Sequence, residues 1–346
     1  MVKYVLKRMG LALVTAFIIL SLTFILVYSL PVDRFLGQEP QQVAYYDQQV
    51  SRGYCEVTKG KPNPELGEIL FQYKDSNGRD IYYYKSSVPK QYVSWLKNIV
   101  TKWDWGTSLK IEPNVRATVI IGGRITYSIR LNIISVIFSV PIGILLGIWA
   151  ALKKNTLTDH TISTLVMVFI SVPSFVLITF MILIFGYKLG WVPTQWPNLT
   201  DTTQNKILGY ILPVFCLSFG SICGYCRFTR AELCEVMESD YLLLARTKGL
   251  TRKQAIMRHA LRNAMVPIVP SILAEFIGIL GGSMILERLY GIPGIGQLFI
   301  ESIQAKDYNI LFVDMAIFTT IGLLAGVILD ISYGFIDPRI RMGAKK

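Results

Sequence analysis

The sequence predicts an all-α polytopic membrane protein with six transmembrane helices, a cytoplasmic loop of short helices and a small mixed α/β insertion outside the membrane. Charged residues make up only 17% of the 346 residues, whereas a soluble domain carries about 25%. The mean hydropathy is +0.44, and the apolar residues are gathered into long runs. These runs predict the spans, and the positions of Lys and Arg predict their orientation.

Six apolar segments are long enough to cross a membrane. A transmembrane helix needs about 20 mainly apolar residues to cross roughly 30 Å of hydrocarbon. Backbone amides in lipid must be satisfied within the segment, so we expect helices. They lie at 9–30, 127–152, 161–185, 207–226, 265–286 and 310–336. The first run is long for a secretory signal, and Ser29-Leu30-Pro31 is a poor cleavage site, so we expect a membrane anchor.

Lys and Arg are distributed asymmetrically around these spans. The segment 227–264 carries Arg227, Arg230, Arg246, Lys248, Arg252, Lys253, Arg258 and Arg262. The two short loops on the other side carry Lys188, Lys206, Arg288 and Lys306. This positive-inside pattern predicts that both termini are cytoplasmic. It also explains the net charge of +12 without any role for nucleic acid.

The segment 31–124 is the one sizeable soluble piece. Its runs 69–73 and 81–85 flank Asn77-Gly78, which predicts a β-hairpin. A helix is predicted to begin at Ser87 and Pro89. The apolar face of this helix holds Tyr92, Trp95, Leu96, Ile99 and Trp103. We expect the hairpin, the membrane surface or a partner to cover that face, which leaves both a self-contained cap and an outer docking surface open.

The cytoplasmic segment 227–264 is too polar to cross the membrane and too long for a simple turn. Asp240 is a suitable N-cap for a helix over 241–248, and Gly249 is placed to end it. Thr251 and Gln254 have the spacing of a capping box that opens a second helix toward Asn263. The segment is therefore predicted to form a helix, a glycine turn and a second helix.

Three interpretations of this loop compete. It is a connector held near anionic headgroups by basic residues such as Arg258 and Arg262. Alternatively it docks a cytoplasmic partner, because Ala245 and Gly249 lie four residues apart and leave one face without side-chain bulk. A DNA-reading helix-turn-helix is disfavoured, because membrane spans tether both ends.

Motifs of common enzyme classes are absent. The sequence has no G-x-x-x-x-G-K-[ST], H-E-x-x-H or G-x-S-x-G. The glycine-rich run 291–296 follows a span rather than a strand, so it predicts an outer turn. His160 and His259 fall on separate loops, and Cys223-x-x-Cys226 has no second Cys or His pair nearby. We therefore expect no metal site, no cofactor and no enzymatic activity on this chain.

Four charged residues fall within or at the ends of predicted spans. Arg130, Asp314 and Asp330 lie near span ends, where they can reach headgroups. Glu275 is deeper, and charges at that depth are costly and commonly functional. It is a candidate for lining a pathway, or it pairs with a polar neighbour; the sequence leaves both open.

Several strings resemble one family of proteins. The most specific is ARTKG at 245–249, followed by RHALRN at 258–263 and Pro267. Further strings are WGTS at 105–108, VPSF at 172–175, LGWVP at 189–193, YGIPGIG at 290–296, KDY at 306–308 and DPRIR at 337–341. Together they resemble the permease subunits of bacterial ABC importers for dipeptides, oligopeptides and nickel, most closely the first permease of oligopeptide systems. The likeness is weaker over 31–99.

The resemblance implies an organisation and a set of partners. Residues 1–30 would hold the N-terminus and first helix, 31–124 an extracytoplasmic insertion, and 125–346 a five-helix permease core with the coupling loop 227–264. The partners would be a second permease, two ABC ATPase subunits that bind ATP and Mg, an extracytoplasmic peptide-binding protein, the peptide and membrane lipids. The location would be the bacterial cytoplasmic membrane.

The resemblance also implies a mechanism. ATP-driven closure of the ATPases would pull the coupling loops together and turn the pathway outward, and hydrolysis would reset it. Coupling roles carry over onto Asp240, Tyr241, Ala245, Lys248, Gly249 and His259. No string specifies a substrate contact.

Three alternatives are weighed against a peptide importer. The same architecture could import nickel or another small solute, although no outer His or paired Cys is available to receive a metal. An ion-coupled secondary carrier is a different class, but it would usually have repeated halves and midplane charges. An intramembrane enzyme would need a nucleophile and base or a metal set, and neither is present.

Overall fold

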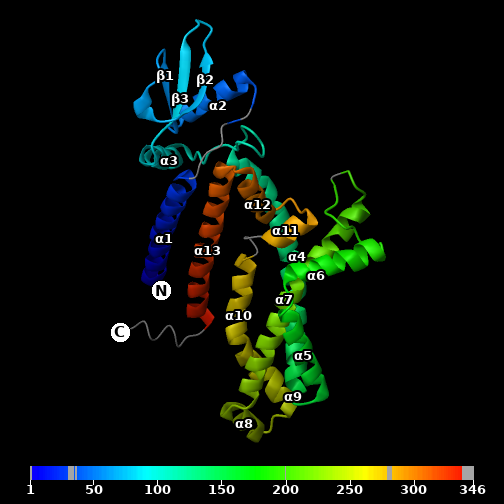
Figure 1. The fold of residues 1–346 in the computed structure, drawn as a ribbon. Helices are drawn as coiled ribbons and strands as arrows, with labels where there is room; N and C mark the ends of the chain where they lie inside the picture. Colours follow the sequence, from blue (N-terminus) through cyan, green and yellow to red (C-terminus); the bar gives the residue numbers. More distant parts are fainter. Residues whose placement is uncertain (1, 30–34, 36, 199, 279–282, 337–346) are drawn as a thin grey trace. The chain divides into compact units, whose positions relative to one another are not determined.

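The computed structural model of the protein describes residues 2–29, 35, 37–198, 200–278 and 283–336 (Figure 1). Within these residues, four helices are long and apolar enough to cross a membrane. They are α1 (Val2–Ser29), α4 (Ala117–Leu152), α7 (Thr203–Met237) and α13 (Tyr308–Ile336). A bent helix pair makes a fifth if it is counted as one span. The chain is thus a multi-pass helical membrane protein.

The bent pair falls on the predicted span 161–185. Helix α5 (Leu157–Ile170) ends at the VPSF string, α6 (Ser174–Met181) starts there, and the π-helix η2 (Ile182–Lys188) continues it. The two arms meet at 97°. Pro173 is the N-cap of α6, and a proline cannot donate the amide hydrogen bond that would continue α5. This break was not predicted.

The predicted span 265–286 is also divided. Helix α10 (Leu261–Gly278) covers its first part and α11 (Met284–Tyr290) its end, while residues 279–282 lie outside the described residues. Helix α10 contains Pro267 and Pro270, which each remove one backbone donor. The carbonyls four residues before them, of Asn263 and Val266, therefore lose their helical partners. Ser271 Oγ also donates to the Pro267 carbonyl at 3.1 Å. Prolines are tolerated in membrane helices when neighbouring groups satisfy the freed backbone.

The chain folds into two compact units. One comprises the described parts of Met1–Met9, Arg124–Gln297 and Ile321–Lys346. In it, α7 contacts α5 on one side and α10 on the other (Figure 1). Helix α4 also packs closely on α7, at Gly143 and Gly147. Small residues four apart let two membrane helices bring their backbones together.

The other unit comprises Gly10–Gly123 and Leu298–Thr320. It holds an antiparallel sheet in the order β1-β3-β2, formed by β1 (Cys55–Lys59), β2 (Ile69–Lys74) and β3 (Asp80–Lys85). The predicted hairpin is present, with Tyr73 opposite Ile81 and Gly78 at φ +72° in its turn. Strand β1, helix α2 (Glu39–Ser51) and the 3-10 turn η1 (Pro64–Leu66) were not predicted.

The core of this unit is aromatic. Tyr45 and Tyr46 of α2 pack against Tyr83 and Ile81 of β3 and against Cys55 of β1. Rings stack across the interface, with Tyr46 5.3 Å from Phe71 and 5.4 Å from Tyr83 between centroids. Aromatic pairs in such offset geometry stabilise a small core beyond their buried area.

Helix α3 (Val88–Lys102) begins directly after Ser87, as predicted. Its apolar face is covered by the first membrane helix rather than by the hairpin, the lipid surface or another protein. Trp95 is buried and lies 4.9 Å from the Phe24 ring of α1. Tyr92 and Ser21 share a hydrogen bond at 2.8 Å between their hydroxyl oxygens. Trp103, which the periodicity assigns to the same face, follows the helix at φ +52° and is exposed.

Candidate docking site and the contacts that hold it

The segment 240–260 forms a short helix, a glycine turn and a return helix, as predicted. Helix α8 spans Asp240–Thr247, and Lys248 is its C-cap. Gly249 follows at φ +94°, a backbone conformation that favours glycine. The predicted N-cap is wrong by one residue: Ser239 occupies that position, and Asp240 lies in the first turn. A carboxylate there still stabilises the helix, because the N-terminal dipole is positive.

The return helix opens with the predicted capping box. The Gln254 amide donates to Thr251 Oγ1 at 3.3 Å, and the Thr251 amide donates to Gln254 Oε1 at 3.1 Å. Helix α9 (Arg252–Ala255) runs through the π-helix η3 (Ile256–Ala260) directly into α10. The predicted second helix is therefore continuous with α10 and not a separate element.

One residue anchors α8 to the helix bundle. Leu242 is buried in an apolar cluster with Ala151, Leu233, Cys234, Ala255, Ile256, Ala260 and Ala264. This cluster joins the ends of α4 and α7 to α9 and η3. Small alanines dominate it, so α8 lies close to the return helix. The loop is consequently a packed extension of the bundle.

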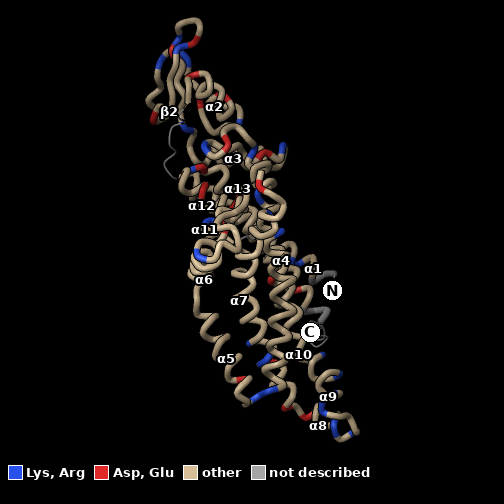
Figure 2. Tube along the Cα trace, turned by 90° about the vertical axis from the view of Figure 1, so that its right-hand side faces the viewer, with Lys and Arg blue, Asp and Glu red and all other residues tan. Residues whose placement is uncertain are grey.

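The opposite face of α8 is apolar and exposed. Tyr241, Leu243 and Leu244 expose 41%, 61% and 56% of their surface. Charged residues gather around α8 and α9, whereas long stretches of α4, α7 and α10 carry few (Figure 2). Exposed apolar side chains in such a polar setting are typical of a protein interaction surface.

The six residues singled out for coupling all lie on this loop. Asp240, Tyr241, Lys248, Gly249 and His259 are exposed, and Ala245 is half-buried. A Cβ at Gly249 would meet no atom within 4 Å. His259 is on η3, which contacts α8. The loop thus brings these positions together and leaves nearly all of them open to another molecule.

Two ion pairs brace the base of the loop, and sequence reasoning missed both. Arg230 of α7 donates from Nε and Nη2 to the two carboxylate oxygens of Asp159, at 2.5 and 2.7 Å. The Asp159 side chain is buried, and the Asn155 amide also donates to it at 3.0 Å. Lys154 pairs with Glu238, and its hydrogen bond to that carboxylate raises the pKa of Lys154. The Arg230–Asp159 pair is bidentate, so it fixes geometry as well as charge.

A cavity of about 410 Å³ lies between the Lys154–Glu238 pair and α8. Its walls combine apolar residues such as Leu152 and Met237 with charged groups of both signs, among them Arg252 and Glu238. It adjoins the candidate docking face, because Leu243 contributes to both.

Glu275 of α10 has a polar neighbour. The Ser221 hydroxyl on α7 donates to Glu275 Oε1. Of the two interpretations left open by the sequence, pairing is therefore observed, and a role in a pathway stays a prediction. The side chain remains partly exposed within the described residues.

A buried carboxylate holds the glycine-rich turn at 291–296. Glu287 of α11 accepts hydrogen bonds from Ser128 Oγ at 2.7 Å, from the Ser283 amide at 3.2 Å and from the Gln297 amide at 3.1 Å. A Cβ at Gly296 would lie 2.7 Å from the Met284 nitrogen. A side chain at this position would clash with the backbone, which explains why the last residue of the YGIPGIG string is glycine.

A second buried carboxylate joins two other strings. Asp307 Oδ2 accepts from Ser108 Oγ at 2.5 Å and from the amides of Leu109, Lys110 and Ile111 at 2.9, 3.0 and 3.2 Å. Successive amides that converge on one oxygen form an anion-binding nest. Ser108 of the WGTS string and Asp307 of the KDY string are thus in direct contact.

These features define a class of protein: a multi-pass helical membrane protein whose helix bundle carries a packed loop with an exposed apolar face. Among the described residues, no group of three or more His, Cys, Asp or Glu could hold a metal ion. The chain belongs to the family of binding-protein-dependent transport system inner membrane components, and the model of this family matches residues 143–342.

Full-length relatives agree with this family. The dipeptide transport system permease protein DppB of Lactococcus lactis subsp. cremoris is 33% identical over 99% of this chain and 100% of its own length. The oligopeptide transport system permease protein OppB of Haemophilus influenzae is 30% identical over the same shares. An inward-facing structure of the MetNI methionine ABC transporter matches with a TM-score of 0.52, 17% identity, and 64% and 97% coverage of the two chains. At that identity the likeness concerns the fold alone.

Proposed function

We propose that this chain is one of two pathway-forming permease subunits of an ATP-driven importer of peptides. The observation that carries the proposal is α8: it is anchored by buried Leu242 and presents exposed Tyr241, Leu243 and Leu244 to another molecule. The names of the relatives, which are dipeptide and oligopeptide permeases, support peptide as the substrate class.

The proposed topology has six spans with both termini in the cytoplasm of a bacterium. Helix α10 with its two prolines would supply the span beyond the four long helices and the bent pair. Residues 1–30, 31–124 and 125–346 would form the first helix, an extracytoplasmic insertion and the permease core. The concentration of Lys and Arg in 227–264 supports this orientation.

The proposed partners each have a place in this scheme. A second permease would complete the pathway, and two ABC ATPase subunits would bind ATP and Mg and carry out hydrolysis. An extracytoplasmic binding protein would deliver the peptide. The ATPase would contact Asp240, Tyr241, Ala245, Lys248, Gly249 and His259, whose exposure supports that role.

The anchoring of α8 suggests how force would reach the pathway. Leu242 ties α8 to α7 and η3, and η3 continues without interruption into α10. A pull on α8 would therefore move α7 and α10 together. Glu275 and Ser221 join the same two helices, so the proposed pathway residue lies on the elements that would move.

Reconstitution tests this function. We expect ATPase subunits and a second permease to co-purify with the chain, and ATP-dependent peptide uptake into proteoliposomes when loaded binding protein is added. Mass spectrometry of the binding protein's ligand separates peptide from nickel or another small solute. Uptake driven by an ion gradient with this chain alone would contradict the proposal and favour the secondary carrier.

A further inference from the structure

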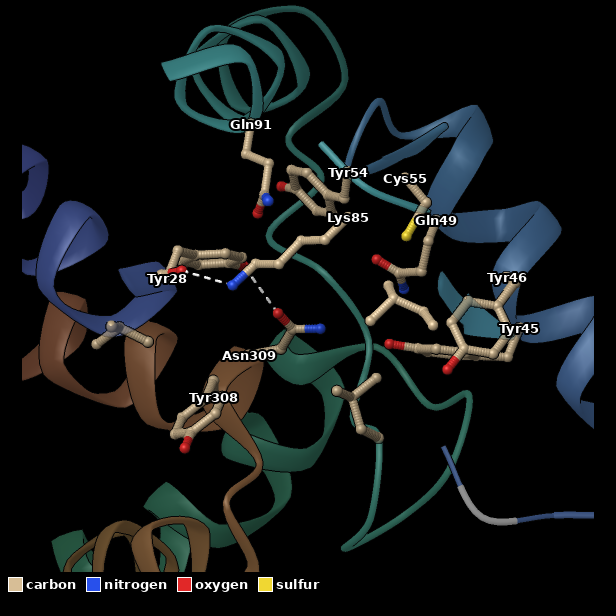
Figure 3. A pocket seen from close by; sticks show the side chains of 13 residues that line it. Tyr28, Tyr45, Tyr46, Gln49, Tyr54, Cys55, Lys85, Gln91, Tyr308 and Asn309 are labelled. Carbon is tan, nitrogen blue, oxygen red and sulfur yellow. Dashed lines mark hydrogen bonds between the residues drawn. The ribbon is translucent and has the colours of Figure 1, made fainter. Parts of the chain in front are cut away.

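A small cavity lies within the unit that holds the sheet. Its volume is about 60 Å³, and helices α1, α2, α3 and α13 and strands β1, β2 and β3 contribute to its walls (Figure 3). One water molecule needs about 10–15 Å³ of cavity volume, so this cavity has room for a group of roughly four to six heavy atoms. Apolar side chains such as Val27, Leu70 and Leu109 line part of it.

The polar groups in this cavity are one cation, Lys85, and side chains that both donate and accept, namely the amides of Gln49, Gln91 and Asn309 and the tyrosine hydroxyls. Lys85 extends across it and its ammonium donates to the Tyr28 carbonyl at 2.9 Å, which leaves two of its three protons for other acceptors (Figure 3). Gln49 is only 5% exposed, and its amide nitrogen has no hydrogen-bond partner. Among the described residues that line the cavity, none is Asp or Glu.

This arrangement is costly for the chain unless something occupies the cavity. A buried donor without an acceptor carries the full cost of its desolvation. Burial lowers the pKa of Lys85, and no carboxylate among the described residues that line the cavity offsets the loss of hydration. Other buried amides are satisfied: Gln91 donates to the Ser86 carbonyl and Asn309 to the Thr107 carbonyl. The unsatisfied donors are thus confined to the Gln49 and Lys85 side of the cavity.

We propose that this cavity binds a carboxylate group, with Lys85 and Gln49 as its donors. One positive charge matches one carboxylate, two acceptor oxygens match two donor side chains, and the apolar wall accommodates the attached carbon. A shallower groove of about 560 Å³ shares Tyr28, Leu70 and Lys85 with the cavity. That groove gives a longer molecule a way out, so the carboxylate belongs either to a small free acid or to the C-terminus of a short peptide.

Ligand-observed NMR on the full chain, within its transporter complex in nanodiscs and without binding protein, tests this site. The probes are acetate, triglycine and triglycine amide. We expect saturable binding of acetate or triglycine and none of the amide at this site. Binding of triglycine without acetate identifies a peptide terminus, and binding of acetate identifies a free acid as sufficient.

Three variants assign the binding to the cavity. Lys85→Met should weaken binding about tenfold to hundredfold, because it removes a charge-assisted hydrogen bond. Lys59→Met is the matched control, since Lys59 is an exposed lysine of the same sheet and should bind as wild type. Gln49→Leu keeps the test decisive if Lys85→Met does not fold. It removes an unsatisfied amide, so it should fold as well as wild type, and it should still bind the probes at least about tenfold more weakly.

The proposal is wrong if wild type binds neither acetate nor triglycine, because the cavity then holds only water. It is equally wrong if Lys85→Met and Gln49→Leu bind like Lys59→Met. The site does not depend on peptide transport, since acetate binding is measured without ATP, binding protein or uptake.

Discussion

The close contact between α4 and α7 predicts an unusual response to alanine. A Cβ built on Gly147 would lie 2.6 Å from the Cys226 carbonyl oxygen and 2.7 Å from Thr229 Cβ. Ordinary contacts of this kind are 3.4–4 Å, so Gly147→Ala would have to move the helices apart by about 0.8 Å. Thr229 is fully buried and the other contact is backbone, so neither can turn away.

The magnitude follows from two opposing terms. Alanine in a helix interior gains about 1 kcal/mol over glycine. Overpacking of a close interface costs about 1–3 kcal/mol. We therefore expect Gly147→Ala to lower the free energy of unfolding by up to about 2 kcal/mol, and a β-branched substitution to lower it further.

Gly122→Ala is the matched control, because Gly122 lies on the same helix, is exposed and has nothing within 4 Å of a built Cβ. It should be neutral or stabilising by up to about 1 kcal/mol. The assay is SDS-induced unfolding in mixed micelles, followed by tryptophan fluorescence. If Gly147→Ala stabilises the protein as much as Gly122→Ala, the close packing of α4 on α7 is refuted.

Three further predictions concern buried polar groups. Asp307→Ala should lower the free energy of unfolding by about 3–5 kcal/mol and admit trypsin at Lys110, because four donors lose one acceptor; unchanged stability and proteolysis would contradict the nest. Arg230→Ala should cost about 2–4 kcal/mol by the same unfolding assay, since Asp159 is left buried and charged; an effect below about 0.5 kcal/mol would argue against the brace. Burial raises the pKa of Cys55 to about 12, so its thiolate becomes abundant only near that pH. At pH 8, alkylation of the folded protein should therefore be about a hundredfold slower than after unfolding, and equal rates by mass spectrometry would show that the thiol is accessible.

Local signals in the sequence predicted the elements that depend on neighbouring residues. Asn77-Gly78 predicted the hairpin, because a tight turn needs positive φ, and Thr251 and Gln254 predicted the capping box. Strand β1 was missed because it is only five residues long and includes the charged Glu56 and Lys59, although Gly53 and Gly60 flank it. Helix α2 was missed because it is polar overall, although one face buries Tyr45 and Tyr46.

Contacts between distant residues lay beyond sequence reasoning. Asp307 and Ser108 are 199 residues apart, and periodicity says nothing about such a pair. Both belong to strings that the family resemblance singled out, which was the available signal. The bend at Pro173 had a local cause, yet its surroundings were apolar enough to be taken for an uninterrupted span.

The coupling roles remain predictions, and two glycines allow a controlled test of them. Gly249 and Gly60 have φ of +94° and +93°, and neither has an atom within 4 Å of a built Cβ. Tryptophan at either position therefore meets the same backbone strain. Only Gly249→Trp also places bulk beside the exposed face of α8.

The most direct measurement is peptide-stimulated ATP hydrolysis and ATPase co-purification for wild type, Gly249→Trp and Gly60→Trp, each reconstituted in lipid. The account predicts that Gly60→Trp behaves as wild type, whereas Gly249→Trp loses the ATPase subunits or at least about tenfold of the stimulated rate, equivalent to about 1.4 kcal/mol of coupling. Full retention and stimulation with Gly249→Trp would contradict docking at this loop and leave it as a connector.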